Sequence, residues 1–335
     1  MDHGLPPRAR IAGLGHHLPP RIVTNDDLAE LMDTSDQWIQ ERTGIRERRF
    51  VDEGTSCTDL AEAASRKAIE NAGWTPEDVE FILFATLSPD LFFPGNGARL
   101  QHQLGLGPIG ALDLRTQCTG FVYALSVADA LIRAGQYRRI LVVGAEVQSR
   151  GLRMDDEGRD TAVLFGDGAG AACVEASDDE RGFLAHSLHS DGANALDLCV
   201  RKPGSLQVPF VSAEDIAAGD TAPHMNGREV FRNAVRRFPE AIQEVLTAAG
   251  VPAQELKLLV PHQANARITE AVRRRMELPE DKVASNIDRY GNTTAASIPI
   301  ALSEAVEEGR VSQGDLVCLA AFGAGFTWGA TLLRY

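Results

Sequence analysis

Cys118 is the side chain in this sequence best placed to act as a nucleophile. It follows the strand-like run ALDL and begins the apolar segment FVYALSVADALIRAG. The free N–H groups and positive dipole at a helix start stabilise a thiolate, so this position predicts a cysteine with a lowered pKa. Unpaired cysteines are more often small buried apolar residues, and we expect that role for the other four, Cys57, Cys173, Cys199 and Cys318.

His262 and Asn292 complete a candidate catalytic set. His262 ends the strand-like run KLLVPH, and catalytic groups collect at strand ends in α/β proteins. Asn292 lies in a Gly-Asn turn, NIDRYGNTTAASIP, before a helix of small residues. Taken singly, each would more often be a structural residue. With Cys118 they form a Cys/His/Asn set at three strand-to-helix junctions.

A glycine-rich segment, AAFGAGFTWGATLL (320–333), follows an apolar strand. Glycines there allow a tight turn whose N–H groups point into a cavity, as an oxyanion hole requires, although a close-packed turn has the same pattern. The segment FGDGAG (165–170) has neither G-x-G-x-x-G nor a GK[ST] ending, which argues against a Rossmann or P-loop site.

The elements around these residues indicate an α/β protein with largely parallel, doubly covered strands. Residues 58–73 form an amphipathic helical pattern, whereas 121–135 are apolar on nearly every side and predict a buried helix. Apolar runs that predict buried strands cover 81–87, 111–114, 140–147, 161–174, 257–262 and 315–323.

Two internal similarities indicate a duplicated chain. AGWTPEDVEFILFA (72–85) matches AGVPAQELKLLVPH (249–262) at an offset of 177, and each copy predicts a helix end, a turn and a strand. FGDGAG and FGAGFTWG match at an offset of 157, which predicts an insertion in the first half. We place the halves at 1–178 and 179–335.

Composition excludes several classes of protein. The 335 residues carry 33 Lys and Arg against 47 Asp and Glu, and a net charge of −14 opposes binding to nucleic acid or anionic membranes. No stretch approaches the roughly 18 apolar residues of a membrane span. The first ten residues have no signal-peptide pattern, which predicts a cytoplasmic protein. The five cysteines lack the spacing of a disulfide framework or zinc site.

The segments TQCTGF, PHQAN, YGNTTAASIP and FGAGFTWG, together with TSDQWIQERTGIRERR (34–49), resemble the β-ketoacyl-acyl carrier protein synthase III family of the thiolase superfamily. The resemblance covers essentially the whole chain, with the motifs in the family's order. It implies a duplicated, five-layered α/β/α/β/α thiolase-like fold, in agreement with the internal duplication of the sequence. It also implies a homodimer and a reaction that needs no metal or redox cofactor.

By the same resemblance, Cys118 is acylated by a short acyl-CoA primer, and His262 and Asn292 act on malonyl-acyl carrier protein. The N–H groups of Cys118 and Ala324 would form the oxyanion hole. The implied reaction is a decarboxylative Claisen condensation that initiates fatty-acid or polyketide synthesis. Phe93 would close the partner's acyl pocket. The implied coenzyme A and phosphopantetheine residues are Trp38, Arg42, Thr43, Arg159, Asn265 and Arg267.

A basic surface is predicted on the second half. Arg228, Arg232 and Arg236 share one face of a predicted helix, and Arg273, Arg274 and Arg275 add to the charge nearby. In an acidic protein this surface favours docking of the acidic carrier protein, with Arg232 and Arg274 at the family's docking positions. The alternative is a solvated stripe paired with neighbouring acids.

Thr116 and Gln117 depart from the family, where small residues often precede the cysteine, and the primer is therefore left open. Ala324 replaces a glycine of some members. The alternative functions are an acyltransferase using an oxygen or nitrogen nucleophile, or a long-chain acyl condensing enzyme. A non-catalytic scaffold or a Cys/His hydrolase is the alternative from another class. The presence of both His262 and Asn292 favours condensation.

Overall fold

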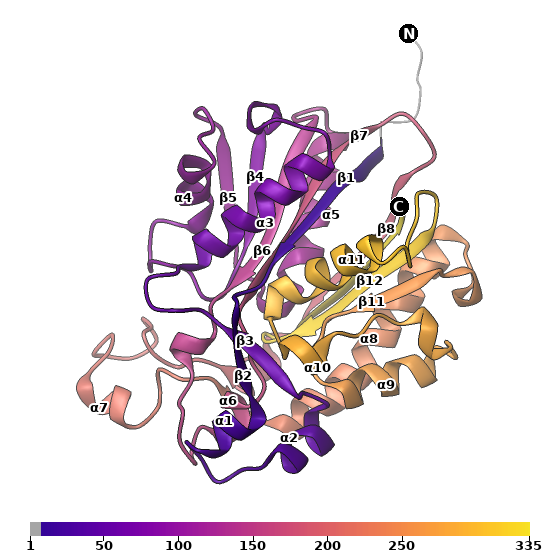
Figure 1. Cartoon of the computed structure of the whole chain (residues 1–335). Coiled ribbons are helices and arrows are strands. Elements are labelled where there is room, and N and C mark those ends of the chain that lie inside the picture. The colour runs from indigo at the N-terminus through magenta and orange to yellow at the C-terminus, as the bar shows by residue number, and fades with distance from the viewer. Residues whose placement is uncertain (1–7) are drawn as a thin grey trace.

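Two mixed β-sheets, one from each half of the chain, face each other across two buried helices (Figure 1). This computed structural model describes residues 8–335. The prediction that residues 1–10 lack a secretory signal falls largely outside the described residues. Within residues 8–335, no helix combines the length and apolar character that a membrane crossing requires.

The first sheet has the spatial order β1-β7-β6-β4-β5. In this sheet β4 pairs in parallel with β5 and β6, whereas β7 is antiparallel to β1 and β6. Its strands are β1 (Arg8–His17), β4 (Phe81–Ala85), β5 (Gly110–Leu114), β6 (Arg139–Glu146) and β7 (Gly168–Ser177).

The second sheet has the order β11-β12-β13-β8, in which only β11 and β12 are parallel. Its strands are β8 (Gly182–Ser190), β11 (Leu258–Pro261), β12 (Leu316–Gly323) and β13 (Thr327–Arg334). Two short ribbons lie outside the main sheets, β2 (Arg21–Thr24) with β3 (Glu47–Phe50), and β9 (Leu198–Cys199) with β10 (His224–Met225).

The longer helices complete five layers. Helices α3 (Cys57–Asn71) and α4 (Asn96–Gln103) cover the outer face of the first sheet. Helices α5 (Gly120–Arg133) and α11 (Ser297–Glu307) fill the space between the sheets, and α8 (Gly227–Ala249) and α9 (Ala266–Arg275) cover the second sheet. The predicted α/β/α/β/α layering and the buried helix at 121–135 are confirmed.

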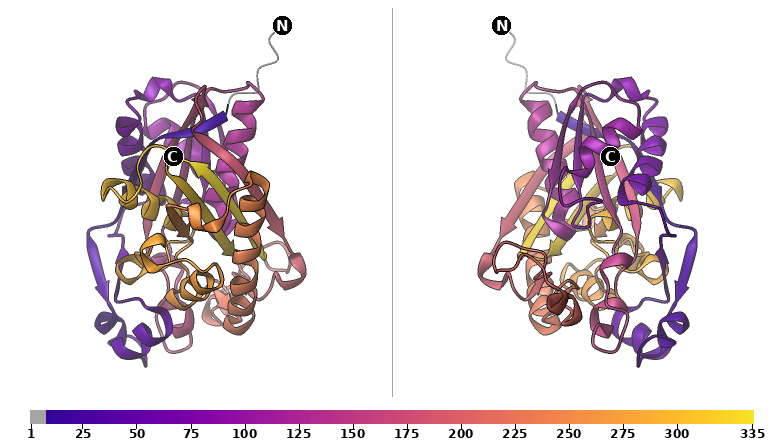
Figure 2. Two further views of the ribbon diagram at one scale, coloured as in Figure 1. Left: turned by 90° about the vertical axis from the view of Figure 1, so that its right-hand side faces the viewer. Right: turned by 90° about the vertical axis from the view of Figure 1, so that its left-hand side faces the viewer.

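Shorter helices occur in the connections. They are α1 (Asn25–Ala29), α2 (Asp36–Thr43), α6 (Arg159–Ala162), α7 (Ala213–Ala217) and α10 (Ile287–Tyr290). Figure 2 shows the indigo segment with α1 and α2 beside the orange helices of the second half, and α2 contacts α9. Segments far apart in the sequence therefore meet at this end of the molecule.

The predicted duplication appears as matching elements 177 residues apart. Gly73 and Gly250 both have positive φ after a long helix, at 69° and 66°. Each is followed by a 3-10 turn and then a strand, β4 or β11. Residues 147–167 connect β6 to β7, whereas only 324–326 connect β12 to β13, which accounts for the smaller offset of the second similarity.

Three strand predictions are corrected by the structure. The strands are not largely parallel, because β1, β7, β8 and β13 all pair antiparallel in the main sheets. The run 111–114 is not buried, because β5 is an edge strand with exposed residues. The run 161–174 begins in α6, and its strand starts only at Gly168.

Candidate active site

Cys118, His262 and Asn292 line one cavity of about 450 Å³. Cys118 comes from the first half of the chain, whereas His262 and Asn292 come from the second. Most of the cavity wall is apolar, including Val163, Leu164, Phe165, Leu198, Met225, Phe231, Phe238 and Phe322. The cavity can therefore accept an apolar chain beside a small polar centre.

Cys118 lies in the 3-10 turn η2 (Gln117–Thr119), which leads directly into α5. Gln117 has a φ of 47°, and the Thr119 hydroxyl donates to the Thr116 carbonyl at 2.6 Å. This tight turn places the sulfur at the start of the buried helix, as the sequence predicted.

The predicted lowering of the Cys118 pKa is wrong. Burial raises the pKa of this thiol to about 12, and the carboxylate of Glu146 adds to the rise, while the backbone N–H of Cys118 opposes it. The start of a helix acts locally on the thiol, whereas the cost of a buried charge comes from both halves of the chain packed around the sulfur. The resting thiol is therefore neutral at pH 7.

His262 is a buried, neutral imidazole with one free nitrogen. Its Nδ1 lies 2.6 Å from the Ser297 Oγ, and its buried Nε2 has no hydrogen-bond partner among residues 8–335. Burial lowers the pKa of His262 to about 3. An unpaired buried polar atom is costly, and Nε2 is available to a group that enters the cavity.

Asn292 is held by its own turn. Its backbone N–H donates to the Leu164 carbonyl at 2.8 Å, and its Oδ1 accepts the Thr294 N–H at 2.9 Å. These bonds orient the side chain and leave its amide NH2 group available as a donor. The turn continues through η7 (Thr294–Ala296) into α11, as predicted for a turn before a small-residue helix.

The turn between β12 and β13 lies directly against the nucleophile. A Cβ added to Gly323 would lie 2.8 Å from the Cys118 Cβ and 3.2 Å from its N and Sγ, so a side chain does not fit there. Ala324 follows in this turn and is not among the residues with positive φ, so alanine suits its conformation. Gly323 lines the cavity beside Cys118.

Trp38 lies at the mouth of the cavity with two arginines over its ring. The guanidinium carbons of Arg42 and Arg159 lie 4.5 and 4.9 Å from the ring centroid. Trp38 and Arg42 line the cavity, whereas Arg159 does not line it and is connected to the site by its contact with the Trp38 ring. Arg159 also donates to the Asp33 carbonyl at 2.6 Å.

Thr43, Asn265 and Arg267 also line the cavity. The Thr43 hydroxyl donates to the Ile39 carbonyl at 2.7 Å and accepts the Ile45 N–H, so it is used within the chain. Asn265 caps α9 and donates to the Arg42 carbonyl at 3.0 Å, which joins α9 to α2. The guanidinium carbon of Arg267 lies 5.7 Å from the centroid of the Phe231 ring.

Comparison with known proteins identifies the family of this chain. A family model described as 3-oxoacyl-[acyl-carrier-protein] synthase III matches residues 112–192, and its C-terminal counterpart matches 246–335. The chain is 47% identical over 327 residues to the β-ketoacyl-[acyl-carrier-protein] synthase III of Xanthomonas euvesicatoria, covering 98% of each chain. The chain belongs to the β-ketoacyl-[acyl-carrier-protein] synthase III family.

Solved structures of synthase III proteins agree with this assignment. The 3-oxoacyl-[acyl-carrier-protein] synthase III of Aquifex aeolicus matches with a TM-score of 0.90 and 43% identity, covering 98% of this chain and 100% of that one. A priming β-ketosynthase of a polyketide pathway matches with a TM-score of 0.89 and 32% identity, covering 99% and 98%. The predicted thiolase fold and condensing acyltransferase class are confirmed.

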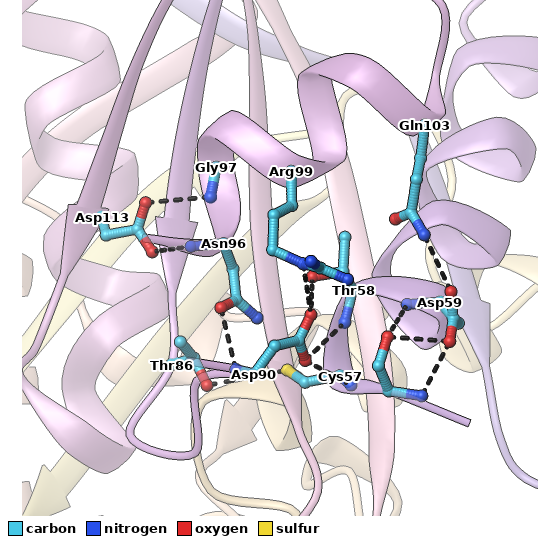
Figure 3. A network of polar contacts seen from close by, with 11 residues as sticks. Cys57, Thr58, Asp59, Thr86, Asp90, Asn96, Gly97, Arg99, Gln103 and Asp113 are labelled. Carbon is cyan, nitrogen blue, oxygen red and sulfur yellow. Dashed lines mark hydrogen bonds and ion pairs between the residues drawn. The ribbon is translucent and has the colours of Figure 1, made fainter. Parts of the chain in front are cut away.

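Phe93 lies outside the cavity of this synthase III chain, with 80% of its surface exposed. Asp90, three residues earlier in the same loop, connects the loop to α3 and α4 (Figure 3). The Asp90 carboxylate accepts the Cys57 N–H at the start of α3 and pairs with Arg99 of α4, both at 2.9 Å. Asn96 accepts the Asp90 N–H at 3.0 Å, so the loop has a rigid base below an exposed tip.

The predicted basic surface of this synthase III chain is partly neutralised. Arg232 pairs with Glu229, Arg236 approaches Glu240 at 4.0 Å, and Arg273 and Arg274 pair with Glu270. Arg228 and Arg275 have no acidic partner within 4 Å among residues 8–335. Arg228 also lines the cavity, which the sequence did not predict.

Three features of the site were not predicted from the sequence: Ser297, the contact of Gly323 with Cys118, and the apolar wall. The wall residues Phe231 and Phe238 are seven apart on α8, a helical spacing that predicts a buried face but not a cavity. Ser297 lies five residues after Asn292 in the segment YGNTTAASIP. Its contact with His262 depends on tertiary structure.

The lowered pKa of His262 predicts a pH-dependent stability. Below about pH 6.5 the unfolded chain protonates this histidine, while the folded chain resists protonation until about pH 3. The stability of the wild type relative to His262→Gln should therefore fall as the pH drops from 7 to 4, by up to about 1.4 kcal/mol per unit. Urea unfolding of both proteins across this range measures the difference, and a constant difference would contradict the buried neutral state.

Proposed function

We propose that this chain condenses an acyl-CoA primer with malonyl-acyl carrier protein through an acyl-Cys118 intermediate. The observation that carries the proposal is the single apolar cavity that holds Cys118, Asn292 and the unpartnered Nε2 of His262. Family membership supports it.

In the first half-reaction the Cys118 sulfur attacks the thioester carbonyl of the primer. A new C–S bond forms, the bond to coenzyme A breaks, and the departing thiolate takes the proton that Cys118 gives up. Because the resting thiol is neutral, the start of α5 stabilises the negative charge only as it develops on the sulfur during the attack. The N–H groups of Cys118 and Ala324 stabilise the oxyanion.

In the second half-reaction malonyl-acyl carrier protein loses CO2, and the electrons of the broken C–C bond form an enolate. With the Ser297 hydroxyl donating to Nδ1, the neutral His262 carries its proton on Nε2. This N–H and the Asn292 amide donate hydrogen bonds to the enolate oxygen and keep their protons. The enolate carbon then attacks the acyl carbonyl, a C–C bond forms and the C–S bond to Cys118 breaks. The Cys118 thiolate takes up one proton from water, which restores the neutral resting thiol.

The cavity mouth suits coenzyme A and phosphopantetheine. Adenine would insert between Trp38 and Arg159, and Arg42, Arg228 and Arg267 supply cations for phosphate. Asn265 and Thr43 shape this entrance through the bonds that join α2 to α9. We propose no metal or redox cofactor, because each step uses groups of the chain and its two substrates.

A homodimer is part of this proposal. The edge strand β5 exposes its backbone and Leu112, and the loop tip exposes Leu91, Phe92 and Phe93. The ring centroids of Phe92 and Phe210 lie 5.4 Å apart, and Phe210 belongs to a second loop with exposed apolar residues. A second copy covering β5 would bury this surface and bring Phe93 to the partner's acyl pocket.

We also propose a cytoplasmic location, and fatty-acid or polyketide initiation as the pathway served.

The two half-reactions should separate in His262→Ala and Asn292→Ala. Both variants should retain acylation by acyl-CoA within a few-fold and lose about a hundredfold or more in CO2 release from malonyl-carrier protein, because their donors act on the enolate. Intact-protein mass and CO2 release measure the two steps. The matched control is His102→Gln, an exposed histidine of α4. Normal CO2 release from either cavity variant would overturn the assigned roles.

Carrier docking should depend on Arg232. Its pair with Glu229 is exposed and therefore weak, so an acidic partner can compete for it. Arg232→Glu should raise the KM for malonyl-carrier protein about fivefold or more and leave acylation by acyl-CoA nearly unchanged. The control is Arg66→Glu, an exposed arginine of α3 that also pairs with a glutamate. Equal loss of both half-reactions would indicate a solvated stripe instead.

The β5 edge should mediate dimerisation. Leu112→Lys places a charge on this edge and should shift the sedimentation coefficient from dimer to monomer at micromolar concentration. Leu31→Lys changes an equally exposed leucine outside the sheets and should leave the dimer intact. A wild type that sediments as a monomer would refute the dimer.

A further inference from the structure

Glu146, the last residue of β6, is a fully buried carboxylate that the proposed chemistry does not use. It accepts the Ser88 hydroxyl at 2.5 Å, the backbone N–H groups of Leu87 and Ser88, and the Thr86 hydroxyl. It also accepts the Gln148 amide at 3.1 Å and, from the other half of the chain, the Ala295 N–H at 3.4 Å. Burial raises the pKa of Glu146, and these donors oppose the rise.

The duplication explains why a donor from the second half lies here. Gln117 and Thr294 are 177 residues apart and share an unusual positive φ, 47° and 46°. Each is the first residue of a short 3-10 turn that leads into an inner helix, α5 or α11. Ala295 is therefore the counterpart of Cys118, and its turn is a second, cysteine-free version of the nucleophile's turn.

The strand ends that face these two turns are also counterparts, but their residues differ. Gly323 ends β12 against Cys118 and leaves the cavity open, because no side chain is present. Glu146, 177 residues earlier, ends β6 and directs a carboxylate to the Ala295 N–H. The second turn thus has a carboxyl group of the protein against it, whereas the first leaves that space free.

This carboxylate is connected to the decarboxylating residues through the second turn. Gln148 bridges Glu146 and the Thr294 hydroxyl at 3.1 and 3.5 Å. The Thr294 N–H donates to the Asn292 side chain, and Ser297, at the end of the turn, contacts His262. A shift of this turn would move both donors that the proposed second half-reaction uses.

We propose that Glu146 is a positioning residue for the decarboxylation step, in which its carboxylate fixes the 292–297 turn and so sets the directions of the Asn292 and His262 donors. The inference rests on the proposed function, since it concerns one of its half-reactions. An acceptor is required at this position because the N–H groups of Leu87, Ser88 and Ala295 can only donate. A glutamine at 146 would turn its own NH2 group toward some of those donors.

The test compares both half-reactions in Glu146→Gln and Glu146→Asp. In Glu146→Gln the kcat for CO2 release should fall about tenfold or more, with KM for malonyl-carrier protein within about twofold, because misplaced donors affect the transition state. Acylation of Cys118 by acyl-CoA should stay at least as fast as in the wild type. Glu146→Asp, which keeps a carboxyl group with two acceptor oxygens, should recover part of the lost kcat.

The matched control is Asp129→Asn, which changes a buried carboxylate of α5 that pairs with Arg133 and contacts neither turn. Both of its half-reactions should stay within about twofold of the wild type. Equal losses of acylation and CO2 release in Glu146→Gln, or no loss, would overturn the positioning role while leaving the proposed function intact. A wild type that releases no CO2 would overturn both.

If Glu146→Gln does not fold, Gln148→Ala provides the same test. It keeps the carboxylate and removes the bridge to Thr294, so CO2 release should fall and acylation should be retained. A Gln148→Ala protein with unchanged CO2 release would count against the proposal.

Discussion

The close contact between Gly323 and Cys118 is the constraint on which the rest of the structure depends. It joins the end of a strand in one half to the nucleophile of the other, and it exists only because residue 323 has no side chain. The cavity, the turn with Ala324 and the approach of His262 and Asn292 all follow from this junction between two similar halves. At the equivalent junction Glu146 fills the space, so the duplicated fold has one open site and one closed site.

Burial makes the reacting groups neutral at rest. The raised pKa of Cys118 and the lowered pKa of His262 have the same main cause, the cost of a charge buried in a largely apolar site. In the proposed reaction, charge appears only while bonds change, on the thiolate, the oxyanion or the enolate. The start of α5 already lies next to Cys118 in the resting protein, and a donor fixed before the reaction stabilises such a charge without reorganisation.

Features encoded within a single segment could be predicted from the sequence. The buried helix α5, the strand-turn-helix setting of Cys118 and the repeat through Gly73 and Gly250 are local patterns, and the structure has all of them. Strand direction could not be predicted, because continuous apolar runs occur in both parallel and antiparallel pairs, and β8 shows no clear alternation. The pKa of Cys118 was predicted with the wrong sign because its burial depends on the second half. Glu146 was missed because one glutamate at a strand end has no distinguishing spacing.

The proposed reaction requires Cys118 to hold the acyl group in this cavity. Incubation of the wild type with a panel of acyl-CoA thioesters, followed by intact-protein mass spectrometry and peptide mapping, measures where the acyl group is bound. We expect one acyl group per chain, located on the peptide that contains Cys118, with a mass that identifies the preferred primer. No adduct with any thioester, or an adduct on Cys57, Cys173, Cys199 or Cys318, would contradict it.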